Sequence, residues 1–280
     1  MVDKLTRDEL LALASEVLDI EARAVASLKA RMNDDFVAAC NLCMEIPGRV
    51  VVTGIGKSGH ISNKIAATLA STGTPAFFMH PAEASHGDLG MITQHDLLLA
   101  VSLSGETREV VTILPIVKRM GAKLVSMTGN PRSTIAMAAD VNLDISVAEE
   151  ACPLNLAPTA STTATLAMGD ALAVALLKNR GFTAEDFARS HPSGALGKRL
   201  LLRVADVMRT GDRIPAVLAD VTLRDALLEM TDKGLGMTAI VDSEQAILGI
   251  FTDGDLRRSL DSGADIRSTL IREVMHTSCK

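Results

Sequence analysis

The chain has 280 residues, of which 48% are hydrophobic and 22% are charged, as is typical of a soluble globular protein with one large core and a smaller module. Its net charge of -6 argues against a general nucleic-acid surface or an anionic-membrane surface. Aromatic residues make up only 2%, with no Trp and no Tyr, so the stacking platforms of single-stranded nucleic-acid binders are mostly missing. We therefore expect the partner to be a small molecule or another protein.

The first predicted element is a helix over residues 6–31, where apolar residues recur at helical spacing and Thr6 with Glu9 forms a capping-box pattern. Five short apolar runs then alternate with amphipathic stretches, and we predict them as strands: RVVVTG (49–54), TPAFFMH (74–80), DLLLAVSLSG (96–105), KLVSMTG (123–129) and VNLDIS (141–146). Strands that are apolar on both faces and separated by helices indicate a parallel sheet covered on both sides. The predicted fold class is therefore α/β with a doubly wound parallel sheet.

The most hydrophobic stretch, TATLAMGDALAVALLK, is predicted to be a packed helix and not a membrane span, because Gly169 and Asp170 interrupt it. Cys40 and Cys43 form a CxxC pair without a second pair at zinc-finger spacing, and we expect no signal peptide ahead of them. Reduced thiols and a cytoplasmic location follow as expectations.

The stretch VVVTGIGKSGHISNK, at 50–64, is predicted to be a strand, a tight turn and a helix start, which is the geometry of an anion site. A Walker P-loop is excluded, because Val51 stands where that motif requires its first glycine. Gly54, Gly56 and Gly59 fit the dinucleotide fingerprint GxGxxG, but the next strand does not end at the acidic residue that binds a ribose. A smaller phosphate is therefore the favoured ligand.

A second loop, AVSLSGETREV, also runs from a buried strand into a helix. It places the hydroxyls of Ser102, Ser104 and Thr107 beside the backbone N–H groups of a helix start, where they can hold a phosphoryl group. The alternative is that these residues are ordinary helix caps. Lys57 supports the phosphate interpretation, because a cation in the first helical turn opposes the helix dipole unless an anion offsets it. A solvated lysine is the alternative there.

After about residue 180 the composition changes, and RSHPSGALGKRLLLRVADVM is predicted to connect two modules. The pentapeptide VADVM at 204–208 recurs as IREVM at 271–275 with the same apolar frame. This recurrence suggests an internal repeat whose second copy has only begun. Asp253 and Asp255 could bind a ribose hydroxyl, but capping of the following helix is the preferred interpretation.

The chain resembles the sugar isomerase (SIS) family with CBS repeats, and in particular the bacterial arabinose-5-phosphate isomerases. The resemblance covers almost the whole length and rests on GKSGHISNKIAATLASTGTPAFFMHPAEASHGDLGM, SLSGETREV, EEACPLNLAPTASTTATLAMGDALAVALLKNRGFTAEDFARSHPSGALG, TLRDALLEM and FTDGDLRR. It implies a flavodoxin-like SIS domain and a C-terminal CBS module with a truncated second copy. It further implies a cytoplasmic homotetramer without a cofactor that interconverts D-arabinose 5-phosphate and D-ribulose 5-phosphate, the first step toward KDO for lipopolysaccharide or capsule.

The expected segments are an N-terminal helical segment (1–41), the SIS domain (42–184), a linker (185–203), a CBS repeat (204–268) and the start of a second, truncated repeat (269–280). The resemblance implies a nucleotide or another metabolite as the effector of the CBS module. With one copy and the first residues of another, we expect no intact intramolecular effector cleft.

The same resemblance assigns roles to the residues at matching motif positions. The catalytic residues that it implies are Lys57, Glu109, Glu150 and His191. The residues that it places in the substrate pocket are Gly73, Thr74, His80 and His86, with Ser102, Ser104 and Thr107 at the phosphate. One departure is Ser193, where the family often has a glycine, and a positive φ there would strain the loop that carries His191.

The implied reaction opens the sugar ring, removes the C2 proton to form an enediol and returns a proton to C1. We expect Glu150 or His191 to be the base and Glu109 to be a supporting acid or an orienting group. Lys57 would stabilise the enediol oxygen or hold the phosphate.

A required metal is not expected, because acid and base groups suffice for an enediol mechanism. The spacing of His80, Glu83 and His86 also fits no helical zinc signature. The resemblance leaves an inhibitory zinc site at His86 as an expectation.

Two alternatives remain at the level of the sequence. The first is a noncatalytic sugar-phosphate-binding regulator on the same fold, although the N-terminal 45 residues are too short and too acidic for a helix-turn-helix domain. The second is an isomerase of a different phosphosugar, such as a hexulose 6-phosphate.

Overall fold

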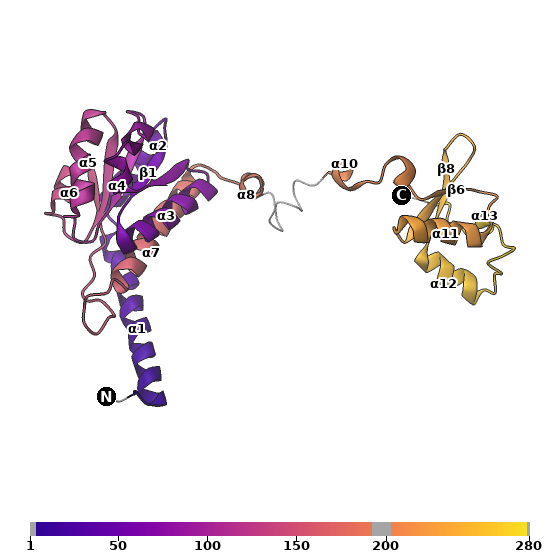
Figure 1. The fold of residues 1–280 in the computed structure, drawn as a ribbon, viewed down its shortest axis with the longest axis horizontal. Helices are drawn as coiled ribbons and strands as arrows, with labels where there is room; N and C mark the ends of the chain where they lie inside the picture. Colours follow the sequence, from indigo (N-terminus) through magenta and orange to yellow (C-terminus); the bar gives the residue numbers. More distant parts are fainter. Residues whose placement is uncertain (1–3, 192–202, 279–280) are drawn as a thin grey trace. The chain divides into compact units, whose positions relative to one another are not determined.

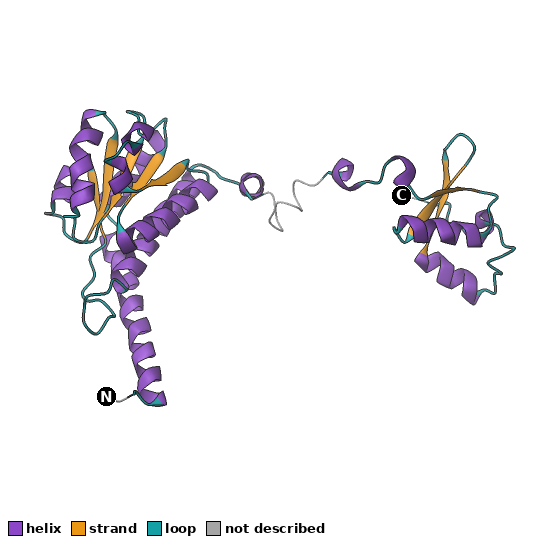
Figure 2. Ribbon diagram, viewed as in Figure 1, coloured by secondary structure: helices purple, strands orange, loops and turns teal. Residues whose placement is uncertain are grey.

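The computed structural model describes residues 4–191 and 203–278, and the chain divides into two compact units, Met1–Leu201 and Leu202–Lys280. The first unit contains one sheet with helices on both faces (Figures 1 and 2). Its five parallel strands have the spatial order β2-β1-β3-β4-β5. They are β1 (Val50–Thr53), β2 (Ala76–Met79), β3 (Leu97–Val101), β4 (Lys123–Thr128) and β5 (Val141–Asp144).

The helices of the first unit follow in chain order. They are α1 (Arg7–Ser27), the 3-10 helix η1 (Leu28–Arg31), α2 (Asp34–Glu45), α3 (Gly56–Ser71), α4 (Pro81–Ala84), the 3-10 helix η2 (Asp88–Met91), α5 (Arg108–Arg119), α6 (Thr134–Ala138), α7 (Ala160–Asn179) and α8 (Ala184–Ser190). The last of these occupies the first part of the range that was predicted as a linker.

Alternating side chains of the strands enter two different cores. Val50 and Val52 pack with residues of α2, α3 and α7 on one face, whereas Val51 packs with residues of α4, α5 and α6 on the other. Both faces of β1 are therefore buried, as expected for a strand in the middle of a parallel sheet. The strand order is that of a flavodoxin-like sheet, so the predicted fold class and all five predicted strands are confirmed.

The predicted N-terminal helix is confirmed in outline and corrected at its end. The capping box is present, because Thr6 accepts from the amide of Glu9 and the Glu9 carboxylate accepts from the amide of Thr6. The α-helical geometry ends at Ser27, and the remaining residues of the pattern form η1. Asn33 then caps α2 by accepting hydrogen bonds from the next helical amides.

Within the described residues, α7 is the one helix that is long and apolar enough to cross a membrane by length and composition. It packs against α1 and α3 in the first unit, where Ala164, Met168, Leu172 and Leu176 belong to the larger core. Burial against other helices is the behaviour predicted for this stretch.

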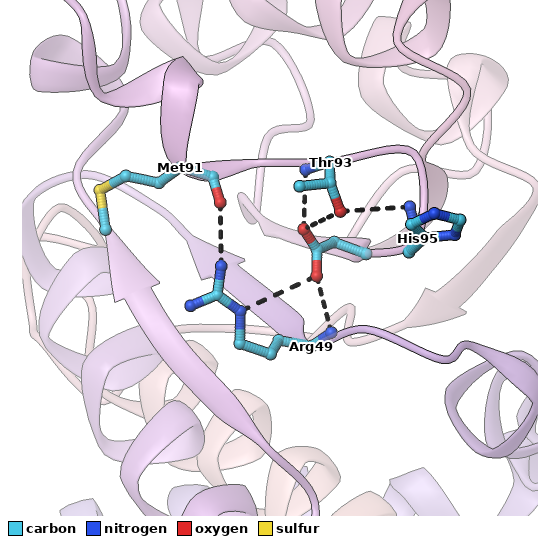
Figure 3. Close-up of polar contacts among 5 residues, drawn as sticks. Arg49, Met91, Thr93 and His95 are labelled. Carbon is cyan, nitrogen blue, oxygen red and sulfur yellow. Dashed lines mark hydrogen bonds and ion pairs between the residues drawn. The ribbon is translucent and has the colours of Figure 1, made fainter.

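Asp96 organises the amino edge of the sheet, just before β3. Its carboxylate accepts hydrogen bonds from the amides of Arg49 and Thr93, both at 2.7 Å, and from the Thr93 hydroxyl at 2.8 Å. Arg49 Nε lies 3.9 Å from Asp96 Oδ1, and Arg49 Nη2 donates to Met91 O at 3.1 Å (Figure 3). The chain entering β1 is thereby joined to the loop before β3.

The second unit has a three-stranded sheet in the order β6-β7-β8, with β6 parallel and β8 antiparallel to β7. Its strands are β6 (Ala216–Leu218), β7 (Met237–Val241) and β8 (Ile247–Thr252). Its helices are α10 (Val204–Val207), the 3-10 helix η3 (Gly211–Arg213), α11 (Leu223–Lys233), α12 (Asp253–Asp261) and α13 (Ile271–Val274). The core consists of Leu223, Ala226, Met230, Ile240, Phe251 and Ile271.

Two predictions for the second unit can be compared with its structure. The repeated pentapeptides both form a single helical turn, α10 and α13, and each turn is followed by a methionine in extended conformation. Asp255 caps α12 in a box with Thr252, so the predicted capping role is confirmed for this residue.

Candidate active site

The carboxyl edge of the sheet has a topological switch point between β1 and β3. These strands are neighbours, but α3, which follows β1, packs on one face and α5, which follows β3, packs on the other. The two connections diverge there and leave a crevice, which is where open α/β sheets bind ligands. The two loops predicted to hold phosphate both begin at this point.

The first loop brings the start of α3 close to β1. A Cβ atom at Gly54 would lie 2.7 Å from Ser62 Oγ, and one at Gly59 would lie 2.8 Å from Gly54 O, so only glycine permits this approach. Gly56 has a φ of +59° at the turn. The N-cap residue Ile55 makes no side-chain cap, so the first amides of α3 are available to a ligand, and Lys57 is exposed beside them.

The second loop brings together the three predicted hydroxyls. Ser102 is 2% exposed, and its Oγ lies 2.7 Å from Thr107 Oγ1 and 3.5 Å from Ser104 Oγ. It also accepts a hydrogen bond from the Gly105 amide at 3.1 Å. Thr107 is the N-cap residue of α5 but does not cap the helix with its side chain. The hydroxyls and the first amides of α5 together form a group of donors for an anion.

Glu106 holds this loop against α6, a role that the sequence analysis did not identify. Its two carboxylate oxygens accept from the amide and the hydroxyl of Thr134, both at 2.7 Å. The hydrogen bonds from the Thr134 hydroxyl and amide hold the pKa of Glu106 below its usual range. Gly105 has a φ of +67° and passes so close to Ser133 that no side chain would fit. In the sequence, the signal for this role was Thr134, a hydrogen-bonding residue at the start of α6.

Glu109 lies in the first turn of α5 with an exposed side chain. It is the second residue of the helix that Thr107 begins. Within the described residues, its carboxylate makes no hydrogen bond or ion pair with a protein group. Among the described residues, no protein group therefore competes with a ligand for the Glu109 carboxylate.

Glu150 is half-buried at the N-terminus of α7. Its Oε2 atom accepts from the Thr159 amide at 2.8 Å, the Thr159 hydroxyl at 3.1 Å and the Ser161 amide at 3.1 Å. Burial by itself raises the pKa of this carboxyl group, but the hydrogen bonds from Ser161 and Thr159 outweigh it and lower the pKa below the usual range. The carboxyl group is therefore ionised at neutral pH.

Two cavities meet at Glu150. One cavity, of about 310 Å³, is lined by Leu103 of the loop 102–107 after β3, here called the hydroxyl loop. Its other lining residues are Val147, Ala148, Glu149, Glu150, Asn155, Leu156 and Pro158. The other, of about 440 Å³, is lined by Glu150 and by Leu13, Glu16, Val17, Ile20, Glu149, Ala151, Cys152, Pro153 and Asn155. The first cavity connects the surroundings of the proposed base to the loop of Ser102.

The histidines predicted for the substrate pocket follow β2. His80 is the N-cap of α4, and its Nδ1 accepts from the Ala82 amide at 3.3 Å. His86 is exposed in the turn after α4. In the part of the chain that the structure describes, no group of three or more His, Cys, Asp or Glu could hold a metal ion. The inhibitory zinc site at His86 stays a prediction without a ligand set there.

Gly73 and Thr74 lie at the amino edge of the sheet, before β2, and so at the opposite edge from the two loops. A Cβ atom at Gly73 would lie 2.3 Å from the Phe182 ring. The Thr74 hydroxyl accepts from Arg180 Nε at 3.1 Å, and Arg180 also donates to Cys43 O at 2.9 Å. A single chain therefore does not bring this pair together with the hydroxyl loop.

His191 follows α8, where its ring stacks on Phe187 with centroids 4.1 Å apart. Its Nδ1 lies 3.1 Å from Phe187 O. Among residues 4–191 and 203–278, no hydrogen bond, ion pair or ring contact joins His191 to another predicted catalytic residue. Ser193, at which the sequence departs from the family pattern, lies outside the described residues.

Comparison with known proteins identifies both units. The family model of the SIS domain matches residues 46–175, and that of the CBS domain matches residues 204–262. The arabinose 5-phosphate isomerase KdsD of Pseudomonas aeruginosa is 64% identical over 262 residues, which cover 94% of this chain and 80% of the relative. The protein of the same name from Escherichia coli K12 is 60% identical over 260 residues, covering 93% and 79%.

A solved structure of c3406 from E. coli CFT073 in complex with arabinose 5-phosphate resembles the first unit, with a TM-score of 0.65 and 41% sequence identity. The match covers 67% of this chain and 100% of that one. Sequence identity of this extent leaves no doubt about kinship, and the chain belongs to the family of arabinose 5-phosphate isomerases, with a SIS domain followed by a CBS domain.

Proposed function

We propose that this protein interconverts D-arabinose 5-phosphate and D-ribulose 5-phosphate through an enediol. The observation that carries the proposal is the convergence of Ser102, Ser104 and Thr107 at the start of α5, at the switch point of the sheet. Three hydroxyls and free helix amides suit a phosphate monoester. The relatives named arabinose 5-phosphate isomerase, and the solved neighbour in complex with that sugar phosphate, support it as the substrate.

In the proposed mechanism the phosphate binds at the hydroxyl loop, and Glu150 removes the C2 proton of the open-chain aldose. The electron pair of the broken C–H bond forms the C1–C2 double bond, and the carbonyl π pair moves to O1. Protonation of O1 gives the neutral enediol; loss of the O2 proton then forms the C2 carbonyl while the C1–C2 π pair takes up a proton at C1, which completes the ketose. The ionised state of Glu150 at neutral pH is the state that a base requires.

The other proposed groups assist this proton transfer. Lys57, exposed at the start of α3, would stabilise the developing enediolate oxygen or bind the phosphate. Glu109, at the start of α5, would act as the supporting acid or orient the substrate. His191 is the second candidate for the base, and His80 and His86 would contact the sugar. No cofactor is required.

We further propose a homotetramer in the cytoplasm. On α1, the apolar side chains of Leu10, Leu11 and Leu18 are 54%, 54% and 68% exposed, and burial against further copies would remove them from water. A site built from more than one copy would also account for the distance of Gly73, Thr74 and His191 from the hydroxyl loop in a single chain.

The proposed effector of the CBS domain is a nucleotide or another metabolite. A largely apolar cavity of about 330 Å³ in the second unit would form part of its site, since one repeat alone is not expected to complete the cleft; the cavity is lined by Val207, Met208, Arg209, Ile214, Pro215, Leu235, Met237 and Ala239. Thermal shift with ATP would test this point. The name KdsD of the relatives supports a place at the start of KDO synthesis for lipopolysaccharide or capsule.

The deciding experiment measures the turnover of D-arabinose 5-phosphate by the wild type, Lys57→Ala and Lys123→Ala. The rate is read from the formation of the ketose. Lys123 is an exposed lysine at the amino edge of the sheet and serves as the matched control. We expect loss of activity in Lys57→Ala alone. Ribose 5-phosphate and glucose 6-phosphate are offered as competing substrates. Binding without turnover by the wild type would instead support a sugar-phosphate-binding regulator.

A further inference from the structure

The carboxylate of Glu150 replaces the cap that α7 otherwise lacks. Thr159 occupies the N-cap position, but its hydroxyl does not accept from the helix amides. Glu150 Oε2 accepts instead from the amides of Thr159 and Ser161, at 2.8 and 3.1 Å. A carboxylate at this position is stabilised by the helix dipole as well as by the two amides. The proposed base is therefore attached to a helix whose side chains belong to the larger core of the unit.

Thr159 uses its single hydroxyl twice. Oγ1 donates to Glu150 Oε2 at 3.1 Å and accepts from the amide of Ala151 at 2.8 Å. Asn155, with a φ of +52°, closes the same loop, because its Oδ1 accepts from the amide of Glu150 at 2.9 Å. The hydroxyl thus fixes both the side chain of Glu150 and the backbone that follows it.

The hydrogen bonds from Thr159 and from the Ser161 amide all fall on one carboxylate oxygen, Oε2. The Ser161 side chain also stabilises the ionised carboxylate, and Glu150 lines both cavities described above. A carboxylate with one anchored oxygen can present the other at a defined angle to a carbon-bound proton. Such orientation strongly affects the reaction rate, because a misplacement of the reacting groups by about 1 Å can slow a reaction on the order of a hundredfold.

We propose that Thr159 is a positioning residue for the isomerisation, and that its hydroxyl orients the Glu150 carboxylate for proton transfer at C2. This inference rests on the proposed function, because it takes Glu150 as the base. It adds a residue to which neither the sequence motifs nor the family resemblance assigned a role.

The hydroxyl also affects the ionisation of Glu150. Burial raises the pKa of this group, and the hydrogen bonds from Ser161 and Thr159 lower it by more. Loss of the Thr159 hydroxyl would raise the pKa, so the acidic limb of the kcat/KM profile would move to higher pH. The other titratable or charged groups around the carboxylate are Glu16, Glu149 and Cys152 in the cavities, and Arg23 of α1, which pairs with Glu149.

The test compares Thr159→Val, which removes the hydroxyl at nearly constant shape, with Thr159→Ser, which keeps it. Thr163→Val is the matched control, because Thr163 is a half-buried threonine of the same helix whose hydroxyl donates to another glutamate, Glu21, at 3.0 Å. Circular dichroism verifies folding. For each variant, kcat and KM for D-arabinose 5-phosphate are measured across pH.

We expect kcat of Thr159→Val to fall on the order of tenfold, with little change in KM and with the acidic limb at higher pH. Thr159→Ser and Thr163→Val should stay close to the wild type in both respects. The proposal is overturned if Thr159→Val behaves like Thr163→Val. It is equally overturned if folded Thr159→Ser loses activity, a result that stays informative should Thr159→Val fail to fold.

A Glu150→Gln variant separates this proposal from the function on which it rests. If the wild type turns over the sugar and Glu150→Gln is fully active, Glu150 is not the base and the role of Thr159 falls with it, while the isomerase function stands. A wild type that binds the sugar without turnover removes the proposed function itself.

Discussion

Glu106 and Thr134 form a bidentate contact in which both carboxylate oxygens are engaged by one residue, each at 2.7 Å. The contact joins the hydroxyl loop after β3 to the start of α6. The positions of Ser102, Ser104 and Thr107 therefore depend on a residue that is not itself a phosphate ligand.

Glu106→Gln should raise KM for the sugar phosphate several-fold and weaken inhibition by inorganic phosphate, with kcat largely unchanged. The amide NH₂ group of glutamine cannot accept the hydrogen bond that one carboxylate oxygen accepts, so the loop is held by one contact fewer. Steady-state kinetics with phosphate as the inhibitor measure both constants. Glu45→Gln, at an exposed position on α2, is the control. Equal changes in both variants would contradict the role given to Glu106.

Asp96→Asn should destabilise the first unit by about 2–3 kcal/mol, because an NH₂ group would then face the buried donors of Thr93 or Arg49. Urea unfolding followed by circular dichroism measures the change. Asp19→Asn, at an exposed position on α1, serves as the control. A stability equal to that of Asp19→Asn would show that the buried carboxylate contributes nothing.

The same aspartate predicts a pH dependence of stability. Burial raises the pKa of Asp96, but hydrogen bonds from Arg49 and Thr93 outweigh it, and the folded-state pKa lies below the usual value. Its contribution is therefore complete above the ordinary aspartate pKa and is lost as the pH falls through that value toward the folded pKa. The gap between wild type and Asp96→Asn should narrow in acid, and a gap that widens there would refute this account.

Gly73→Ala should destabilise the first unit by about 2–4 kcal/mol. The new Cβ would lie 2.3 Å from the Phe182 ring, at a backbone φ of +93°. Gly181→Ala is the control, because Gly181 also has a positive φ but no atom within 4 Å of a built Cβ, so only backbone strain of about 1 kcal/mol is expected. A second change, Phe182→Leu, should recover part of the loss. Thermal unfolding of the single and double variants measures the loss of stability and its recovery.

Arg31→Met should loosen the loop that leads to Glu150. Arg31 donates to Ser146 O and pairs with Asp144 at 3.4 Å, with 24% of its side chain exposed. We expect faster hydrogen exchange at residues 145–150, and a stability loss of about 1 kcal/mol because solvent screens part of the pair. Arg7→Met removes an ion pair whose side chains are 85% and 90% exposed, and it should change neither quantity. Unchanged hydrogen exchange at residues 145–150 in Arg31→Met would show that Arg31 does not hold this loop in place.

The sequence was sufficient for features that depend on neighbouring residues. The five strands, the capping box at Thr6 and the tight turn at Gly56 follow from periodicity, side-chain hydrogen bonding over three residues and the steric freedom of glycine. The two loops at the carboxyl edge could also be anticipated, because each carries its glycines and hydroxyls within one short segment. Motif resemblance then added the reaction and the residue types expected to perform it.

How those segments meet depends on the fold of the whole unit. The hydrogen-bond partner of Glu106 lies 28 residues away in the sequence, and the partners of Glu150 lie 9 and 11 residues away. No local sequence pattern predicts such pairs. Gly73 and Thr74 were predicted for the substrate pocket by motif, but β2 carries them to the opposite edge of the sheet from the hydroxyl loop. In a parallel sheet the amino ends of the strands all lie at one edge and the carboxyl ends at the other. The path of the chain through the sheet, and not the residue type, decides at which of these two edges a residue lies.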